Sequence, residues 1–504
     1  MLLAAPLLIF LLFCLVIPTL TLLARGINLQ ALNDPFIFER LAMTLLQASL
    51  SSLLVLVLAL MFGSFLSRFS FRGKAWLEAT LSIPFVVPVL VASLGFLGLF
   101  GTRGWIYNLE GTLWLVLLAN IFYNLGLAIR FVMTALGSRS LELEDVARLE
   151  GATTWQVWRF VTLPLALPSA LIGAGFTFLY TFASFGVPLL LGGVAFATLE
   201  VEMYQSVQRL ELEVAAGLAL LQFLITFGAA WLVTSFEGRH SQSQNFDAYR
   251  PKATGWTRGA LIGSIGFLVL LTFAPLLTVL IKSVWSPNGL TLIHYQRLFA
   301  VSSSVFQISL STAIWNNLRF AALALAVAIP LGISYALAVW RSKNNFLDAL
   351  SLLPLAISST LLGVAYLVSY PSLSASLPLL IAVYTLSAYP LITRATLAAL
   401  RQLDPEMLQA ASLDGANGWQ EFWFILLPLI EHSVRSGIAF SFAVVVGEFA
   451  ATLMLSRPEW ATLTTLIYQR LARPNQIGEA SALAVLLLLL SLSGFWLLSL
   501  RRKN

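Results

Sequence analysis

The sequence predicts an all-α membrane protein with about twelve transmembrane helices, arranged as two parallel six-helix repeats. Three observations lead to this fold class. Of the 504 residues, 59% are hydrophobic and only 10% are charged, whereas a soluble domain has roughly 25% charged residues. Apolar runs of about 20 residues, the length of a spanning helix, recur from end to end. The sequence also repeats itself at a constant offset.

The composition restricts the partners and cofactors that we expect. The net charge is +6, but the basic residues lie in short loops between apolar runs, which indicates membrane orientation rather than nucleic-acid binding. Cys14 is the single cysteine, so no disulfide framework is possible. The three histidines, His240, His294 and His432, lack metal-ligand spacing. We therefore expect a lipid bilayer around the chain, with no nucleic acid, metal or cofactor.

Twelve apolar runs are long enough to span a membrane, and they read as helices because lipid offers no partner for unpaired backbone groups. The first run, Leu2–Ala24, is too long for a signal-peptide core and lacks a basic start, so we interpret it as a spanning helix. The predicted spans are 2–24, 41–66, 76–101, 112–135, 165–187, 213–235, 258–282, 314–340, 347–370, 377–399, 429–455 and 479–500.

The loop charges predict the orientation of these spans. Loop 67–75 is basic, and when it is placed inside, the polar stretch 236–257, the turn 341–343 and the tail 501–503 fall inside too. Lys and Arg are then enriched on the inner side, as the positive-inside rule requires. We expect both termini in the cytoplasm. The predicted domains are a first repeat (1–235), a cytoplasmic linker (236–257) and a second repeat (258–504).

The internal repeat is visible when the sequence is compared with itself at an offset of 264 residues. The match needs no gap from Arg130 to Gln205. It aligns Arg130 with Arg394, Gly151-Ala152 with Gly415-Ala416, Trp155-Gln156 with Trp419-Gln420, Leu163-Pro164 with Leu427-Pro428, and Tyr204-Gln205 with Tyr468-Gln469. Upstream, Pro84 pairs better with Pro354, a slip of six residues that an extra outer loop near 101–111 would explain. Six spans per copy make the copies parallel, with a pathway expected between them.

Two polar loops occupy matching places between the fourth and fifth spans of each half. The first reads Asp145-Val146-Ala147, three residues, Gly151, nine residues, Val161-x-Leu163-Pro164. The second reads Gln409-Ala410-Ala411, three residues, Gly415, nine residues, Ile425-x-Leu427-Pro428. Each predicts a helix-turn-helix on the membrane face. The glycine ends the first helix in a left-handed conformation, a tryptophan (Trp155, Trp419) begins the second amphipathic stretch, and the proline fits the first turn of the next span.

This spacing resembles the "EAA" loop of type I ABC importer permeases, although Asp145 and Gln409 stand where the family has Glu. The resemblance implies that the loops dock into a separate ABC ATPase, present in two copies, and that a periplasmic solute-binding protein delivers the solute. An interfacial loop that only positions two spans is the alternative. No segment matches the phosphate-binding G-x-x-x-x-G-K-[ST] pattern, so we expect a permease subunit in a bacterial inner membrane rather than an enzyme.

The resemblance extends to the fused twelve-span group that includes thiamine and ferric-iron permeases. The first half is similar to thiamine permeases in ANIFYNLGLAIR (119–130), LLLGG (189–193) and ATLEVEMYQ (197–205), whereas GEFAATLML (447–455) also resembles iron permeases. We therefore expect thiamine as the small-molecule substrate, with ferric iron or another small solute as alternatives. An ion-driven secondary transporter and a channel or scaffold subunit are rivals of other classes, but neither explains two matched docking loops.

Glu448 is the clearest candidate pathway residue, because a charged side chain inside a span is usually functional. Ser184 is its counterpart at the 264 offset, and Phe185 and Phe449 follow in sequence. A carboxylate beside aromatic rings suits a cationic, ring-containing solute. The alternative is that Glu448 pairs structurally with a neighbouring helix. We expect Arg130 and Arg394 to extend to the cytoplasmic interface, and Pro84, Pro88 and Pro354 to kink helices along the pathway.

Overall fold

The computed structural model describes most of the chain, and almost all of that part is helical. The described residues are 3–26, 35–193, 196–240, 251–286, 289–299, 308–342, 344–351, 354, 357–373, 376–455, 457–473 and 476–499. Within these ranges, ten helices are long and apolar enough to cross a membrane, and one further pair of helices passes the same test together.

The first half begins with a continuous helix built from α1 (Ala5–Leu11), η1 (Leu12–Val16) and α2 (Ile17–Gly26). The helices that follow are α4 (Pro35–Arg68), α5 (Lys74–Thr80), α6 (Ile83–Val86), α7 (Val89–Phe100), α8 (Leu113–Ala135), α9 (Ser138–Leu149), α10 (Thr154–Val157), η2 (Trp158–Thr162), α11 (Leu163–Phe182), η3 (Pro188–Gly192), α12 (Leu199–Gln208) and α13 (Leu212–His240).

The second half begins with α14 (Gly255–Ser283) and a small antiparallel hairpin of β1 (Trp285–Ser286) and β2 (Gly289–Leu290). Its other helices are α15 (Ile293–Phe299), α16 (Leu310–Ser342), α17 (Asn345–Leu350), α18 (Ser359–Ser369), α19 (Leu377–Leu400), α20 (Pro405–Leu413), α21 (Gly418–Gln420), η5 (Glu421–Leu426), α22 (Leu427–Val446), α23 (Ala450–Leu455), η6 (Pro458–Trp460), α24 (Leu463–Leu471) and α25 (Ile477–Ser499).

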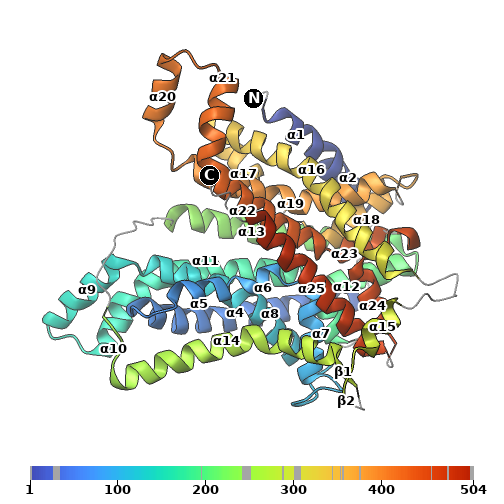
Figure 1. The fold of residues 1–504 in the computed structure, drawn as a ribbon, viewed down its shortest axis with the longest axis horizontal. Coiled ribbons are helices and arrows are strands. Elements are labelled where there is room, and N and C mark those ends of the chain that lie inside the picture. The colour runs from blue at the N-terminus through green and yellow to red at the C-terminus, as the bar shows by residue number, and fades with distance from the viewer. Residues whose placement is uncertain are drawn as a thin grey trace.

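The two halves repeat the same order of helices, as the sequence predicts. In the first half α4, α8 and α11 pack together, and α16, α19 and α22 do so in the second. The slip in the repeat is also explained, because loop 101–112 before α8 is longer than its counterpart 370–376 before α19. In Figure 1, α9 and α20 project at the left, well apart, whereas α12 and α24 lie towards the right.

The first span of each half crosses over and packs against the other half. Helix α14 of the second half lies against α7 of the first, and α2 of the first half lies against α18 of the second. In η1, which precedes α2 in the same span, the carbonyl of Cys14 accepts a 2.6 Å hydrogen bond from the hydroxyl of Tyr366 in α18. The repeats are therefore continuous in sequence but interlocked in space.

The third and ninth predicted spans, 76–101 and 347–370, are not straight helices. Helices Lys74–Val86 and Val89–Phe100 meet at an angle of 101°, and the break falls at Val87-Pro88, where Pro88 is the N-cap of α7. The ninth span is divided into α17 and α18, with Pro354 between them. Proline lacks the N–H that a continuous helix needs, so the predicted breaks at Pro88 and Pro354 are confirmed and the two spans become broken helices. Pro84 instead lies in the first turn of α6, within helix Lys74–Val86.

Candidate translocation cavity and docking segments

A cavity of about 480 Å³ lies between the two halves and is lined by residues from both. The two broken helices form much of its wall. Segment 84–89 comes from the first half, and Pro354 with residues 357–360 comes from the second. The break at each proline turns the chain out of its helical path and presents the residues at the break to the cavity. The wall is largely apolar, with polar side chains from α8, α18 and α19.

Ser184, Phe185, Glu448 and Phe449 all line this cavity. The sequence places them inside continuous spans 165–187 and 429–455, and that detail is wrong. Helix α11 ends at Phe182 and α22 ends at Val446, so the four residues occupy matching breaks beyond the helix ends. In the second half the break coincides with a close approach of backbones, because a Cβ on Gly447 would lie 3.2 Å from Pro88.

The Glu448 carboxylate is half-buried and hydrogen-bonded at both oxygens. The Ser359 hydroxyl donates to Oε2 at 3.1 Å, and the backbone N–H of Ala451 donates to Oε1 at 3.1 Å. The second contact places the carboxylate at the N-terminus of α23, where the helix dipole favours a negative charge. Arg435, a basic residue of the preceding helix α22, forms an ion pair with Glu431. Within the described residues, Glu448 has no ion-pair partner and faces the cavity.

Four aromatic rings form a continuous contact across the boundary between the halves. The Phe185 and Phe449 ring centroids are 5.7 Å apart. Phe185 contacts Tyr204 at 5.5 Å, and Phe449 contacts Tyr468 at 5.4 Å. The two Phe–Tyr pairs are equivalent at the 264 offset, and the two tyrosines also interact with each other. The rings therefore make a symmetric cluster, and its two phenylalanines line the cavity.

A buried polar cluster beside the cavity was not predicted from the sequence. Glu200 in α12 is fully buried and accepts a hydrogen bond from the Gln222 amide of α13. The same amide lies 3.3 Å from the hydroxyl of Ser358, the N-cap of α18. Glu200 is also close enough to Glu448 for their charges to interact. Its segment, Leu199–Gln208, carries a second acid, Glu202, and several other polar residues. The sequence therefore did not single out Glu200, since contacts between distant helices leave no local pattern.

The two predicted docking loops form helix-turn-helix segments in both halves. Gly151 follows α9 with φ +88° and Gly415 follows α20 with φ +82°, so the predicted left-handed helix ends are confirmed. The second helices begin with equivalent capping boxes, Thr153 with Gln156 and Asn417 with Gln420. In each box the cap side chain accepts a hydrogen bond from the backbone N–H of the glutamine, and the glutamine side chain accepts one from the backbone N–H of the cap residue. Both N–H groups would otherwise lack a partner within the helix. The T/N-x-x-Q pattern of these caps is visible in the sequence.

The remaining predicted loop residues fall on these segments at equivalent places. Asp145 and Gln409 are exposed on α9 and α20, Ala147 and Ala411 are half-buried, and Ala410 lies in α20. The residues that follow are half-buried or exposed at the base of the next span: Leu163, Pro164, Ile425, Leu427 and Pro428.

Pro164 and Pro428 lie in the first turns of α11 and α22, as predicted, but the helical path does not begin there. The helix already starts at Thr154 in the first half and at Gly418 in the second, and it runs through the proline to Phe182 or Val446. A π-helical turn, η2 or η5, precedes each proline. The wider turn accommodates a residue that cannot donate to the usual carbonyl, so the helix continues where an α-helical turn would break.

Large apolar side chains are exposed at equivalent positions of the two segments. Leu149 is 88% exposed and its counterpart Leu413 is 89% exposed. Trp155 and Trp419 are also exposed, as are Phe160 and Phe424. Each pair is related by the 264 offset. Exposed apolar groups repeated in register indicate surfaces that contact a partner or the membrane interface.

Sequence comparisons identify the family. Residues 55–242 and 328–501 match the family described as the binding-protein-dependent transport system inner membrane component. The chain belongs to this family. It is therefore a multi-pass transporter component of a bacterial inner membrane, and it works with an ATPase and a solute-binding protein. The two matched segments fall in the two halves, in agreement with a two-repeat type I permease.

Named relatives match along most of their length. The chain is 28% identical to the thiamine transport system permease protein ThiP of Haemophilus influenzae, over 87% of this chain and 85% of the relative. It is 26% identical to ThiP of Escherichia coli, over 90% of this chain and 88% of the relative. It is 23% identical to the ferric transport system permease protein FbpB of Actinobacillus pleuropneumoniae, over 92% of this chain and 71% of the relative.

Proposed function

We propose that this chain is the permease subunit of an ABC importer that moves thiamine from the periplasm to the cytoplasm by alternating access. Two copies of a separate ATPase dock on segments 138–164 and 405–428, and the chain itself hydrolyses no ATP. A periplasmic binding protein delivers the solute at the opposite end. In this arrangement the linker 236–257 and both termini lie in the cytoplasm, and residues 1–235 and 258–504 form the two repeats.

The observation that carries the proposal is one cavity with a carboxylate and aromatic rings from both halves. Glu448 supplies a negative charge, and Phe185 and Phe449 supply ring faces that attract a cation. Thiamine is a cation with two rings, so its charge suits the carboxylate and its rings suit the aromatic side chains. Ser184 contributes a polar group from the opposite half at the same cavity. Similarity to thiamine permeases over most of the chain supports the same solute.

The exposed apolar pairs support the docking role of the two segments. Leu149 and Leu413 stand at the tips beside the left-handed glycines, where a partner protein can enclose them. Both segments lie at the same end of the molecule and apart from each other in Figure 1. Two separate, equivalent sites suit two copies of one ATPase better than a single enclosing partner.

Ferric iron is the second candidate, because a ferric permease is also similar over most of the chain. Reconstitution in proteoliposomes with the ATPase and the binding protein separates the possibilities. We expect ATP-dependent accumulation of labelled thiamine and no accumulation of ferric iron under the same conditions. Uptake of iron instead would replace the substrate, and uptake driven by an ion gradient without ATP would contradict the importer class.

A further inference from the structure

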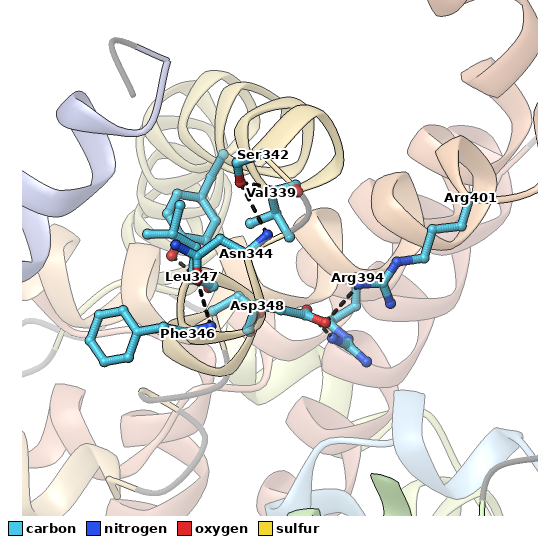
Figure 2. Close-up of polar contacts among 10 residues, drawn as sticks. Val339, Ser342, Asn344, Phe346, Leu347, Asp348, Arg394 and Arg401 are labelled. Carbon is cyan, nitrogen blue, oxygen red and sulfur yellow. Dashed lines mark hydrogen bonds and ion pairs between the residues drawn. The ribbon is translucent and has the colours of Figure 1, made fainter. Parts of the chain in front are cut away.

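Asp348 in the short helix α17 is the centre of a two-arginine ion-pair cluster. Its Oδ1 lies 2.8 Å from Nη1 of Arg394, and its Oδ2 lies 2.7 Å from Nη2 of Arg401. Figure 2 shows the carboxylate directed at both guanidinium groups. Arg394 is thus bound within the protein, rather than only extended to the interface as its position in the sequence suggests. Both arginines belong to the C-terminal end of α19.

A second contact fixes the other side of α17. The hydroxyl of Tyr335, a fully buried residue of α16, donates a 2.7 Å hydrogen bond to the carbonyl of Leu347. A helix of six residues has too few internal hydrogen bonds to be stable alone. Its position between α16 and α19 therefore depends on the tyrosine on one side and the Asp348 ion pairs on the other.

The cluster connects two functional parts of the molecule. Arg401 is the C-cap of α19, and the docking helix α20 begins soon after it, at Pro405. In the other direction, α17 leads to Pro354 and then to residues 357–360, which line the cavity. One carboxylate thus joins the C-terminal end of α19, which leads into the second docking segment, to α17, the first part of the broken helix that leads to the cavity wall.

The first half lacks this connection at the equivalent positions. Glu78 stands in place of the aspartate, but it forms no ion pair within the described residues. Phe65 replaces the buried tyrosine and has no hydroxyl, and Gly137 replaces the second arginine. Arg130 is kept, but it donates a 2.8 Å hydrogen bond to Ser82 instead. Among the residues that the structure describes, the ionic link is therefore found in the second half and not at the equivalent positions of the first.

The first docking segment is held by a different cluster. Glu144 of α9 is buried and lies 3.2 Å from Nη2 of Arg68 at the end of α4, and it accepts a hydrogen bond from Thr162. The residues at the equivalent positions of Glu144 and Thr162 are Leu408 and Leu426. The second segment is also tied to its own base, because Arg341 at the end of α16 lies 3.1 Å from Glu421 of η5. What the second half adds is the Asp348 cluster between α19 and α17.

We propose that Asp348 is a positioning residue for translocation. It makes the cavity wall at α18 follow the movement of the second docking segment when the ATPase subunits close. The inference rests on the proposed function, because it assumes that the docking segments are moved by ATP. It adds that the two ATPase sites act on the pathway unequally, because the second half carries the ionic link between α17 and α19.

The test follows cavity closure directly and does not depend on the transported solute. A cysteine replaces Ser387, which lines the cavity, in a Cys14→Ser background of the full permease–ATPase complex. The labelling rate of that thiol by a small reagent is measured without nucleotide and with ATP plus vanadate. Asp348→Asn should reduce the nucleotide-dependent change severalfold while the ATPase still co-purifies. Asp348→Glu, which keeps the charge, should preserve it, and so should Glu78→Gln at the equivalent place of the first half.

The outcomes separate this proposal from the function on which it rests. A parental nucleotide response in Asp348→Asn, or an equal loss in Glu78→Gln, would overturn the role of Asp348 alone. No nucleotide response with Asp348 intact would contradict the proposed function itself. Loss of the ATPase from the Asp348→Asn complex would make the residue part of the docking surface instead. Arg401→Gln keeps the Arg394 pair and should show a smaller loss, which tests the proposal if Asp348→Asn is not retained in the membrane.

Discussion

At the scale of single residues, Glu448 shows how a charge is kept at membrane depth. Placing a carboxylate at the centre of a spanning helix costs roughly 2.5–3.5 kcal/mol by insertion scales. Glu448 avoids that position, because α22 ends at Val446 and the residue lies in the break before α23. A hydroxyl and a backbone N–H contact its two oxygens. These contacts stabilise the charge and leave it beside the cavity.

Replacing Glu448 with Gln should lower thiamine uptake severalfold. The amide keeps the shape of the side chain and part of its hydrogen bonding but removes the charge that attracts a cation. ATPase co-purification and membrane insertion should stay at parental levels. Initial rates of labelled thiamine uptake in proteoliposomes measure the effect. Glu431→Gln is the matched control, since that carboxylate pairs with Arg435 on α22; equal losses in both variants would assign Glu448 a packing role.

The candidate site could be predicted in part, and the division has a physical reason. Glu448 and Ser184 were found because an acid in an apolar segment is conspicuous and the repeat offset supplies its counterpart. Gln222 and Ser358 were not found, because uncharged polar residues are common in membrane helices and their contact joins distant segments. The role of Asp348 was likewise invisible, since it depends on arginines two turns apart on another helix.

At the scale of elements, the two docking segments depend on one backbone conformation each. Gly151 and Gly415 adopt φ values of +88° and +82°. A Cβ at either glycine would meet nothing within 4 Å, so any cost of a side chain there comes from the backbone. A left-handed conformation costs a residue with a Cβ roughly 1–2 kcal/mol. The turn that exposes Leu149 or Leu413 is therefore the sensitive point of each segment.

The double variant Gly151→Val, Gly415→Val should lose the ATPase while the permease still inserts. Valine is β-branched and strongly disfavours the left-handed region, so both turns should rearrange and misplace the exposed leucines. Pull-down of the ATPase with the solubilised permease measures the loss. Gly418→Val is the control, because this glycine lies in α21, its φ is not positive, and a Cβ there also meets open space. Full ATPase retention in the double variant would contradict the docking assignment.

At the scale of the whole molecule, the halves are held together by exchange of their first spans. The sequence revealed the repeat because its matches are in register, but it could not reveal this exchange, because a helix face that packs on its own half has the same composition as one that packs on the other. The contact of α7 with α14 is very close. A Cβ on Gly95 would lie 2.3 Å from the carbonyl oxygen of Pro275, so only glycine fits there.

Gly95→Val should destabilise the entire permease, rather than one half. The added side chain would meet backbone atoms of α14, which cannot move aside as a flexible side chain can, and overpacking typically costs about 1–3 kcal/mol. A lower Tm of the detergent-solubilised protein in a single transition is the expected result. Gly266→Val, in α14 where a Cβ meets open space, should change the Tm much less. Two separate transitions would show that the halves unfold independently.

The energy stored as membrane potential is lost when ions leak through a transporter. The four-ring contact of Tyr204, Phe185, Phe449 and Tyr468 should limit this leak. Each elementary charge that crosses dissipates about 2.3 kcal/mol per 100 mV of membrane potential. Rings in mutual contact leave little room for hydrated ions, so the cluster should act as an insulator while the cavity is open on one side. The double variant Phe185→Ala, Phe449→Ala should therefore make cells leaky, seen as depolarisation with a voltage-sensitive dye, whereas an undisturbed potential would place the insulating layer elsewhere. Aromatic residues that block ion conduction would thus let the permease import a vitamin without discharging the membrane potential.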